Sequence, residues 1–225
     1  MDFAQIIAIL STLVVFVVSA LLAAFLTKLY IDDRKNISYL VWAAALRFFS
    51  ISVILEILFS FGVYSDFLVK IYLFAAAMPL LVFSAGHIQF IRSEKAKQAY
   101  YYCISALAFI LLGALFVSNI SNPITNYVVH ANLPLLALIP ASIIAASSSI
   151  VLFYIGIKEY MSRKDLKILA IIPGALAFWG ANFYSFSYSP ILLYYFEILG
   201  IMLIWLGIAG LSPKRKSKSK GSQRL

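Results

Sequence analysis

The sequence predicts an all-α membrane protein built as a bundle of seven transmembrane helices. Of its 225 residues, 63% are hydrophobic and only 12% are charged, whereas a soluble domain is about 25% charged. A transmembrane helix needs about 20 apolar residues to cross about 30 Å of hydrocarbon. Seven apolar windows fill the chain, at residues 3–27, 37–61, 68–91, 100–118, 133–157, 166–186 and 190–211.

The links between these windows are short, which predicts one transmembrane domain over residues 1–211. The longest link, SNISNPITNYVVHAN, is still too small for a folded domain. The first window has no positively charged start and is longer than the apolar part of a cleaved secretory signal, so we expect it to remain as a helix. Residues 212–225 form a basic tail that we expect to be disordered.

The distribution of basic residues predicts the orientation. Sixteen of the eighteen Lys and Arg residues lie in the tail or in the links after the first, third and fifth windows. With seven spans, all of these segments are on one side of the membrane. Because basic residues favour the cytoplasmic side, the sequence predicts an amino terminus outside, a carboxyl terminus in the cytoplasm and a location in the cell membrane.

Prolines interrupt three of the predicted spans. Pro79 lies in the third window, Pro140 in the fifth and Pro173 in the sixth. A proline inside a helix removes a hydrogen bond and bends the helix, so each position is a candidate hinge. Pro and Gly are also common in membrane helices in general, which is the simpler interpretation.

Two charged residues lie within the second span, on opposite sides of it. Arg47 is about ten residues from the inner end and therefore about 15 Å deep. Because a charge at this depth is costly, we expect Arg47 to face protein or water. Glu56 is nine positions further on, about 180° around the helix, so it cannot pair with Arg47. We therefore expect the second span to be buried on both sides.

A polar pocket is predicted in the outer third of the bundle. Glu56 leaves the second span at the depth where Lys70 enters the third, and Glu197 lies about 10 Å down the last span. Asn182 and Tyr194 are expected nearby. Two carboxylates against one ammonium leave excess negative charge, so one glutamate should stay protonated or bind a cation. The alternative is a satisfied polar network that fixes helix packing.

The remaining polar residues give no catalytic or metal site. His87, near the inner end of the third span, is more often a hydrogen-bonded packing residue than a ligand. One cysteine and two distant histidines do not make a zinc or haem site. We find no nucleophile beside a base, so the sequence predicts no enzyme, no metal and no cofactor.

The basic tail is expected to contact anionic lipid headgroups or a protein partner at the cytoplasmic face. A tail that only obeys the positive-inside rule is the simpler alternative. No aromatic residue lies among its cations, so nucleic-acid binding is not expected. The cations that carry this prediction are Lys214, Arg215, Lys216, Lys218 and Lys220.

Two resemblances bear on function. Seven spans with an outside amino terminus resemble a microbial rhodopsin, but that family attaches retinal through a lysine in the last span, and ILLYYFEILGIMLIWLGIAG has none. The segments ISYLVWAAALRFFSISVILEILFSFG and KIYLFAAAMPLLVFSAGHIQFI resemble the seven-helix membrane sensor modules of prokaryotic signalling proteins. This resemblance implies a bundle that senses a ligand or its environment and passes the signal to a separate partner.

The expected function is therefore a non-enzymatic receptor- or sensor-like bundle with an outward polar pocket. The first alternative is a small transporter or channel for protons, cations or a small solute, in which the same glutamates carry the ion. The second alternative is a structural subunit of a larger membrane complex.

Overall fold

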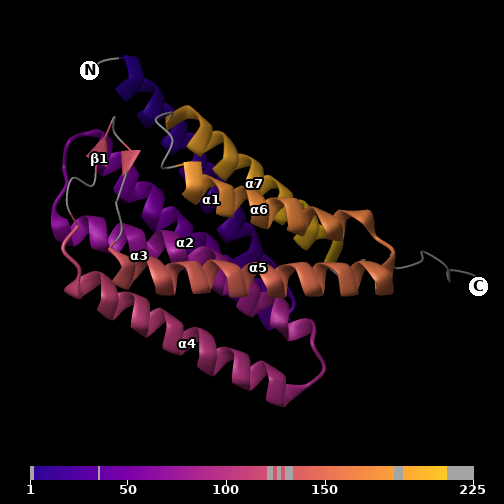
Figure 1. The fold of residues 1–225 in the computed structure, drawn as a ribbon. Helices are drawn as coiled ribbons and strands as arrows, with labels where there is room; N and C mark the ends of the chain where they lie inside the picture. Colours follow the sequence, from indigo (N-terminus) through magenta and orange to yellow (C-terminus); the bar gives the residue numbers. More distant parts are fainter. Residues whose placement is uncertain are drawn as a thin grey trace, which may run out of the picture.

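Seven α-helices make up most of the computed structural model, which describes residues 3–34, 36–120, 124–125, 128–129, 134–184 and 190–211, without the side chains of residues 4, 124–125, 128–129, 178–193 and 210–211 (Figure 1). The predicted all-α fold with seven helices is confirmed, and each helix overlaps a predicted window. The predicted basic tail lies outside the described residues. The helices are α1 (Phe3–Asp32), α2 (Ile37–Ser60), α3 (Asp66–His87), α4 (Glu94–Val117), α5 (Leu135–Arg163), α6 (Ile171–Tyr184) and α7 (Pro190–Leu211).

Three shorter features complete the chain. A 3-10 turn, η1 (Ile88–Phe90), follows α3, and a second, η2 (Leu166–Ala170), precedes α6. In the link between α4 and α5, strands β1 (Ile124–Thr125) and β2 (Val128–Val129) pair antiparallel. This small hairpin was not predicted.

Serine side chains fix where two of the helices begin. The Ser65 side chain accepts a 3.2 Å hydrogen bond from the Leu68 amide at the start of α3, and Ser93 does the same for Ala96 at the start of α4. Such caps satisfy amides that have no partner within the helix. After α2 the chain turns at Gly62, whose φ of 80° suits a residue without a Cβ.

The sixth span is divided between two helix types. Pro173 is the third residue of α6, so it lies in the first turn, where a missing N–H costs no helix bond. Its ring is incompatible with continuing an α-helix backwards through Leu169, and the preceding five residues are the 3-10 helix η2. Pro173 therefore lies at the junction of η2 and α6, where the predicted sixth span changes from a 3-10 helix to an α-helix. Pro79 and Pro140 do lie inside α3 and α5, as predicted.

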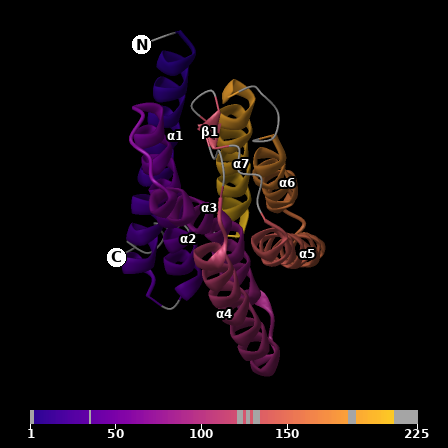
Figure 2. The same ribbon diagram turned by 60° about the vertical axis from the view of Figure 1, so that its left-hand side comes forward.

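The helices pack in two groups that share a core. Helix α2 packs between α1 and α3, while α7 packs against α6, η2 and α1 (Figures 1 and 2). Helix α5 lies against α3, α4 and α6. Helix α4 packs mainly against α3 and α5, and Figure 2 shows it splayed away from the other helices at one end.

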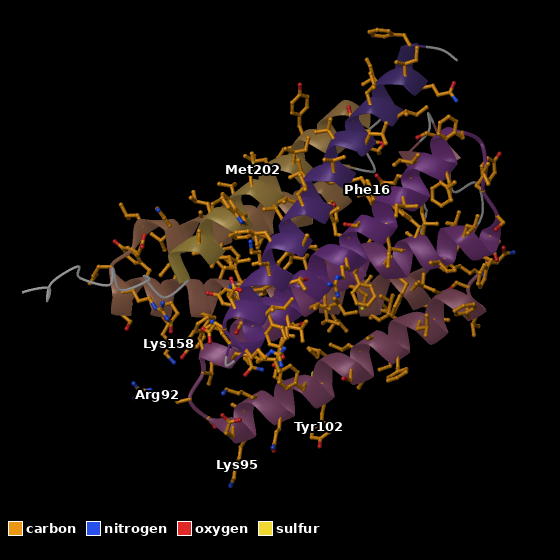
Figure 3. The ribbon with its side chains drawn as sticks, turned by 180° about the vertical axis from the view of Figure 1, so that it is seen from behind. Phe16, Arg92, Lys95, Tyr102, Lys158 and Met202 are labelled. Atoms are coloured by element: carbon orange, nitrogen blue, oxygen red, sulfur yellow. The ribbon has the colours of Figure 1, made fainter. Side chains whose placement is uncertain are left out.

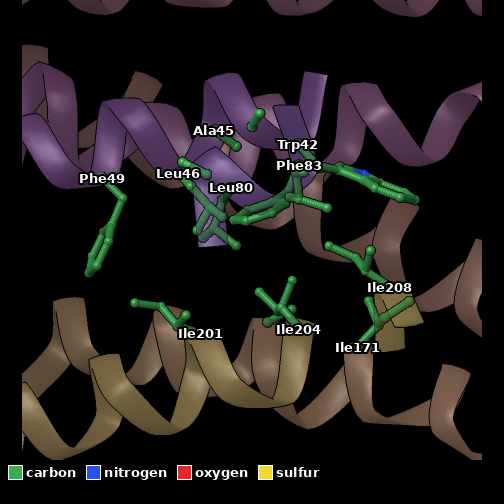
Figure 4. Packing of buried hydrophobic residues seen from close by; sticks show 14 of the residues in the cluster. Trp42, Ala45, Leu46, Phe49, Leu80, Phe83, Ile171, Ile201, Ile204 and Ile208 are labelled. Atoms are coloured by element: carbon green, nitrogen blue, oxygen red, sulfur yellow. The ribbon is translucent and has the colours of Figure 1, made fainter. Parts of the chain in front are cut away.

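Large apolar side chains fill the core between the two groups. Figure 4 shows side chains of α2 and α3 facing isoleucines of α6 and α7 across this core. Helices α6 and α7 approach so closely that a Cβ on Gly174 would lie 2.9 Å from the Ile204 amide nitrogen. The facing side chains are Trp42, Leu46, Phe49, Leu80 and Phe83 on one side and Ile171, Ile201, Ile204 and Ile208 on the other.

Apolarity and charge are separated along the bundle. Among the described residues, five helices are long and apolar enough to cross a membrane, and two more apolar helices are shorter. Large apolar side chains also cover much of the exterior, which in a soluble protein would be unusual. Arg92, Lys95 and Lys158 gather toward one end (Figure 3).

Candidate functional site

A buried acidic cluster lies between α2, α3 and α7. We use this name for Glu56, Tyr72, Tyr194 and Glu197. The two carboxylate residues are only 4% and 6% exposed, and both tyrosines are buried as well. Such burial of two acidic side chains is unusual, because an ionised carboxylate loses its water on burial and needs compensating partners.

Helix geometry brings the four residues to similar depths. Glu56 lies four residues before the end of α2 and Tyr72 six residues after the start of α3, which places them about 6 Å and 9 Å from the helix ends at that side. Tyr194 and Glu197 are three positions apart on α7 and so share a face. The turn at residues 61–65 makes α2 and α3 antiparallel neighbours.

One hydrogen bond joins two members of the acidic cluster. The Tyr72 hydroxyl donates a 2.7 Å hydrogen bond to Oε1 of Glu56. The carboxylates of Glu56 and Glu197 are close enough to repel each other electrostatically, and the Tyr194 hydroxyl lies within electrostatic reach of both. The predicted proximity of the two glutamates and Tyr194 is therefore present in the structure.

Three oxygen atoms of the acidic cluster lack a hydrogen-bond partner among the described residues. They are Oε2 of Glu56, Oε2 of Glu197 and the Tyr194 hydroxyl. Buried polar atoms are nearly always paired, so unpaired ones point to a missing group such as a water, a proton or an ion. The set consists of oxygens only and carries up to two negative charges.

Lys70 is not part of this cluster, which corrects the prediction. Its Nζ forms a 2.7 Å ion pair with Asp66, four residues earlier on α3. Lys70 and Tyr72 are two positions apart and thus point about 200° apart around the helix. Only one of them can face Glu56, and the structure places Tyr72 there.

Tyr72 is the site residue that sequence reasoning missed. Its signal was the helical spacing of the buried residues of α3, in which Val69, Tyr72 and Ala75 recur at intervals of three. That pattern places Tyr72 on the inward face and Lys70 away from it. The predicted site residue Asn182 falls in α6, but its side chain lies outside the described residues.

Arg47 and Glu56 occupy opposite faces of α2, as predicted, but only Glu56 is buried. Arg47 is exposed on the surface of the bundle, where its Nη2 donates a 3.0 Å hydrogen bond to Oγ1 of Thr27 on α1. The expectation that α2 buries both sides is therefore wrong. The Arg47 face carries the exposed residues Ile51 and Ile54, one and two turns further along α2.

His87 is fully buried where α2 and α3 pack together. The Trp42 Nε1–H donates a 3.1 Å hydrogen bond to Nδ1 of His87. Nδ1 also lies 2.8 Å from the Phe83 carbonyl oxygen, which only accepts, so its two contacts favour opposite tautomers of the imidazole. The other ring nitrogen, Nε2, is buried as well. That nitrogen has no partner among the described residues. This geometry fits the packing role expected from the sequence.

The Trp42 indole itself fits over Gly86, where a Cβ would collide with the ring. Phe90 stacks on the indole, with ring centroids 6.0 Å apart. The guanidinium of Arg163 lies 5.8 Å from the Phe90 ring centroid. This aromatic group closes the core at the end of the bundle that carries the basic residues.

Within the described ranges, no three His, Cys, Asp or Glu side chains come together as a metal site. A shallow groove of about 520 Å³ lies along α5 from Tyr154 to Ser162, away from the acidic cluster. Comparison of the chain with family models, curated proteins and solved structures finds no match.

Proposed function

We propose that this chain is a non-enzymatic, multi-pass protein of the cell membrane, a receptor- or sensor-like bundle whose ligand site is the acidic cluster. Five helices of sufficient length and apolarity support a transmembrane arrangement. The sixth crossing is formed by η2 and α6 together: five residues rising about 2.0 Å each and fourteen rising about 1.5 Å each give about 31 Å, close to the thickness of the hydrocarbon.

The same proposal includes the orientation. Basic residues gather at the end of the bundle that holds the links after α1, α3 and α5, which favours a cytoplasmic location for this end and an outside amino terminus. The acidic cluster is then in the outer half of the bundle. Basic links and the tail would contact anionic headgroups or a membrane or cytoplasmic partner protein.

The observation that carries the proposal is the set of three oxygens on Glu56, Glu197 and Tyr194 that have no hydrogen-bond partner among the residues that the structure describes. Oxygen atoms with negative charge select a proton or a small cation, and binding it would remove the repulsion between the two carboxylates. Because these atoms belong to α2 and α7, binding would change the packing of α7 against α2 and α3. A ligand that binds one arrangement better than another shifts the population toward it.

A route from the site to the cytoplasmic end runs along α7. Helix α7 packs against η2 as well as α6. The 3-10 helix η2 contains Lys167 and directly follows the short link after α5, which contains Lys164. A shift of α7 would therefore displace η2 and this link. Pro140 and the start of α6 at Pro173 are the hinges we expect to absorb such a shift.

Thermal unfolding of the purified protein in detergent tests the proposal. The unfolding temperature is measured across pH and with Na⁺, K⁺, Mg²⁺ or Ca²⁺, for the wild type, Glu56→Gln and Glu197→Gln. Glu94→Gln is the matched control, because Glu94 is exposed and pairs only with Lys97 in the described structure. We expect a proton- or cation-dependent shift that both cluster variants lose and the control keeps. Equal responses in all four proteins would reject the site.

A transporter or channel is the second candidate, and one observation favours it. Buried titratable side chains lie toward both ends of the bundle, Glu56 and Glu197 at one end and His87 toward the other. Such groups mark ion pathways in membrane proteins. Flux of protons or cations into proteoliposomes along a gradient, abolished by Glu197→Gln, would favour transport over sensing. Absence of flux together with an intact ligand-dependent shift would favour the sensor.

A further inference from the structure

Arg47 is a charged residue in an unusual place. It lies ten residues after the start of α2, in an otherwise apolar stretch, and yet it is exposed on the outside of the bundle. Charged residues within membrane helices normally face the protein interior and pair there. The position of Arg47 therefore calls for a partner outside the bundle.

The side chain reaches toward the cytoplasmic end. Side chains on a helix lean toward its amino terminus, which for α2 is the end proposed to be cytoplasmic. The hydrogen bond from Nη2 to Thr27 fixes this direction. Thr27 lies five residues before the end of α1, about 7.5 Å from that end. Lys28, the next residue, is the first charge after the apolar stretch of α1.

The guanidinium is thus held at the edge of the apolar zone and not at its centre. Long basic side chains commonly extend in this way to reach the headgroup layer. Thr27 supplies only a neutral oxygen, which itself donates to the Ala23 carbonyl at 2.8 Å. None of the ion pairs found among the described residues involves Arg47, so its charge has no anionic partner in this part of the chain.

We infer that Arg47, held by Thr27, binds the phosphate of an anionic phospholipid from the cytoplasmic leaflet at the junction of α1 and α2. A guanidinium can donate two parallel hydrogen bonds to a phosphate. This inference rests on the proposed function, because it needs the same orientation in the membrane.

An anionic lipid fits these observations better than an acidic helix of another protein. The guanidinium is level with the end of the apolar stretch of α1, where phosphates are available, whereas an acidic side chain on a partner helix would itself have to be buried. The site also lies at the basic end of the bundle, where the positive potential attracts anionic lipid.

Native mass spectrometry and thermal unfolding in detergent test this site, with added phosphatidylglycerol, phosphatidylcholine or inorganic phosphate. The variants are Arg47→Gln and Arg47→Lys. The matched control is Lys95→Gln, which removes an exposed cation of α4 at the same end. We expect the wild type and the control to retain phosphatidylglycerol over phosphatidylcholine, Arg47→Gln to bind it about tenfold more weakly, and Arg47→Lys to fall between them.

Several results would overturn the inference. One is a preference for phosphatidylglycerol that persists in Arg47→Gln; another is equal binding of inorganic phosphate, which would indicate a simple anion site. A third is the loss of a co-purifying membrane protein in Arg47→Gln while lipid binding stays unchanged, which would indicate an acidic partner helix. The cation response of the acidic cluster, measured in the same samples, is expected to be normal in Arg47→Gln, so failure of this site and failure of the proposed function are distinguishable.

Discussion

The hydroxyl of Tyr72 donates a 2.7 Å hydrogen bond to Oε1 of Glu56, joining the last turns of α2 to the first turns of α3. Both side chains are buried, at 8% and 4% exposure. Glu56 therefore has one satisfied oxygen and, among the described residues, one unsatisfied oxygen. Substitutions of Tyr72 and of Glu56 therefore test different contacts of the acidic cluster.

Replacing Tyr72 with Phe removes the donor to Glu56 and leaves a second carboxylate oxygen unpaired. Leaving a buried acceptor unsatisfied costs about 1–3 kcal/mol, so we expect Tyr72→Phe to lower the thermal unfolding temperature in detergent. Tyr102→Phe is the control, because Tyr102 is 78% exposed on α4. An equal effect of both substitutions would show that the hydrogen bond contributes nothing specific.

Glu56 and Glu197 should be energetically coupled. At a pH where both carboxyls are ionised, Glu56→Gln and Glu197→Gln each relieve the same repulsion, and the double variant relieves it only once. We expect the double variant to gain less stability than the sum of the single variants, by about 0.5–3 kcal/mol as for other residues in one network. A double-mutant cycle of chemical unfolding measures this value. Strict additivity would place the two side chains too far apart to form one site.

Lys70 should contribute nothing to the acidic cluster. Its partners are Asp66, whose side chain is 56% exposed, and the Phe116 carbonyl at 3.5 Å. An ion pair with one solvent-exposed partner contributes up to about 1 kcal/mol. We therefore expect Lys70→Met to change stability only slightly and to leave the proton or cation response intact. A lost response would restore Lys70 as a counter-ion of the glutamates and would contradict the placement of Tyr72 on the inward face of α3.

Gly86→Ala should disturb the contact between Trp42 and His87. The added methyl would collide with the indole ring, and crowding in a packed core costs about 1–3 kcal/mol. Gly113→Ala is the matched control, since a Cβ on Gly113 meets nothing within 4 Å. We expect a lower unfolding temperature and altered tryptophan fluorescence for Gly86→Ala only. If both variants unfold at the same temperature, the close packing of Trp42 over Gly86 is not present.

Helix positions were predictable from the sequence because a run of about 20 apolar residues has few alternatives to a membrane-length helix. The division of the sixth span into a 3-10 helix and an α-helix was harder to predict from the sequence. Pro173 could be seen to interrupt a helix, but whether the residues before it bend or form a 3-10 turn depends on how they pack against α7. The hairpin of β1 and β2 had no alternating pattern long enough to indicate it.

The sequence predicted the depth of the site residues along their helices, but not the direction in which each side chain points around its helix axis. Counting residues from a span end placed Glu56, Glu197 and Lys70 in the same layer, and the two glutamates lie within electrostatic reach of each other there. The direction in which Lys70 points depends on the phase of α3, which its buried residues reveal. The exposure of Arg47 depends on which faces of α2 are covered by α1 and α3, and the sequence of one helix does not specify its neighbours.

Infrared difference spectroscopy of the carboxyl groups tests most directly whether the acidic cluster exchanges a proton or cation. Spectra of the wild type are recorded before and after the change of pH or cation that shifts its unfolding temperature, and compared with those of Glu56→Gln and Glu197→Gln. We predict a change in the carboxyl bands that disappears in both variants and persists in Glu94→Gln. Unchanged bands in the wild type, or a change that survives both cluster substitutions, would contradict the assignment of this cluster as the ligand site.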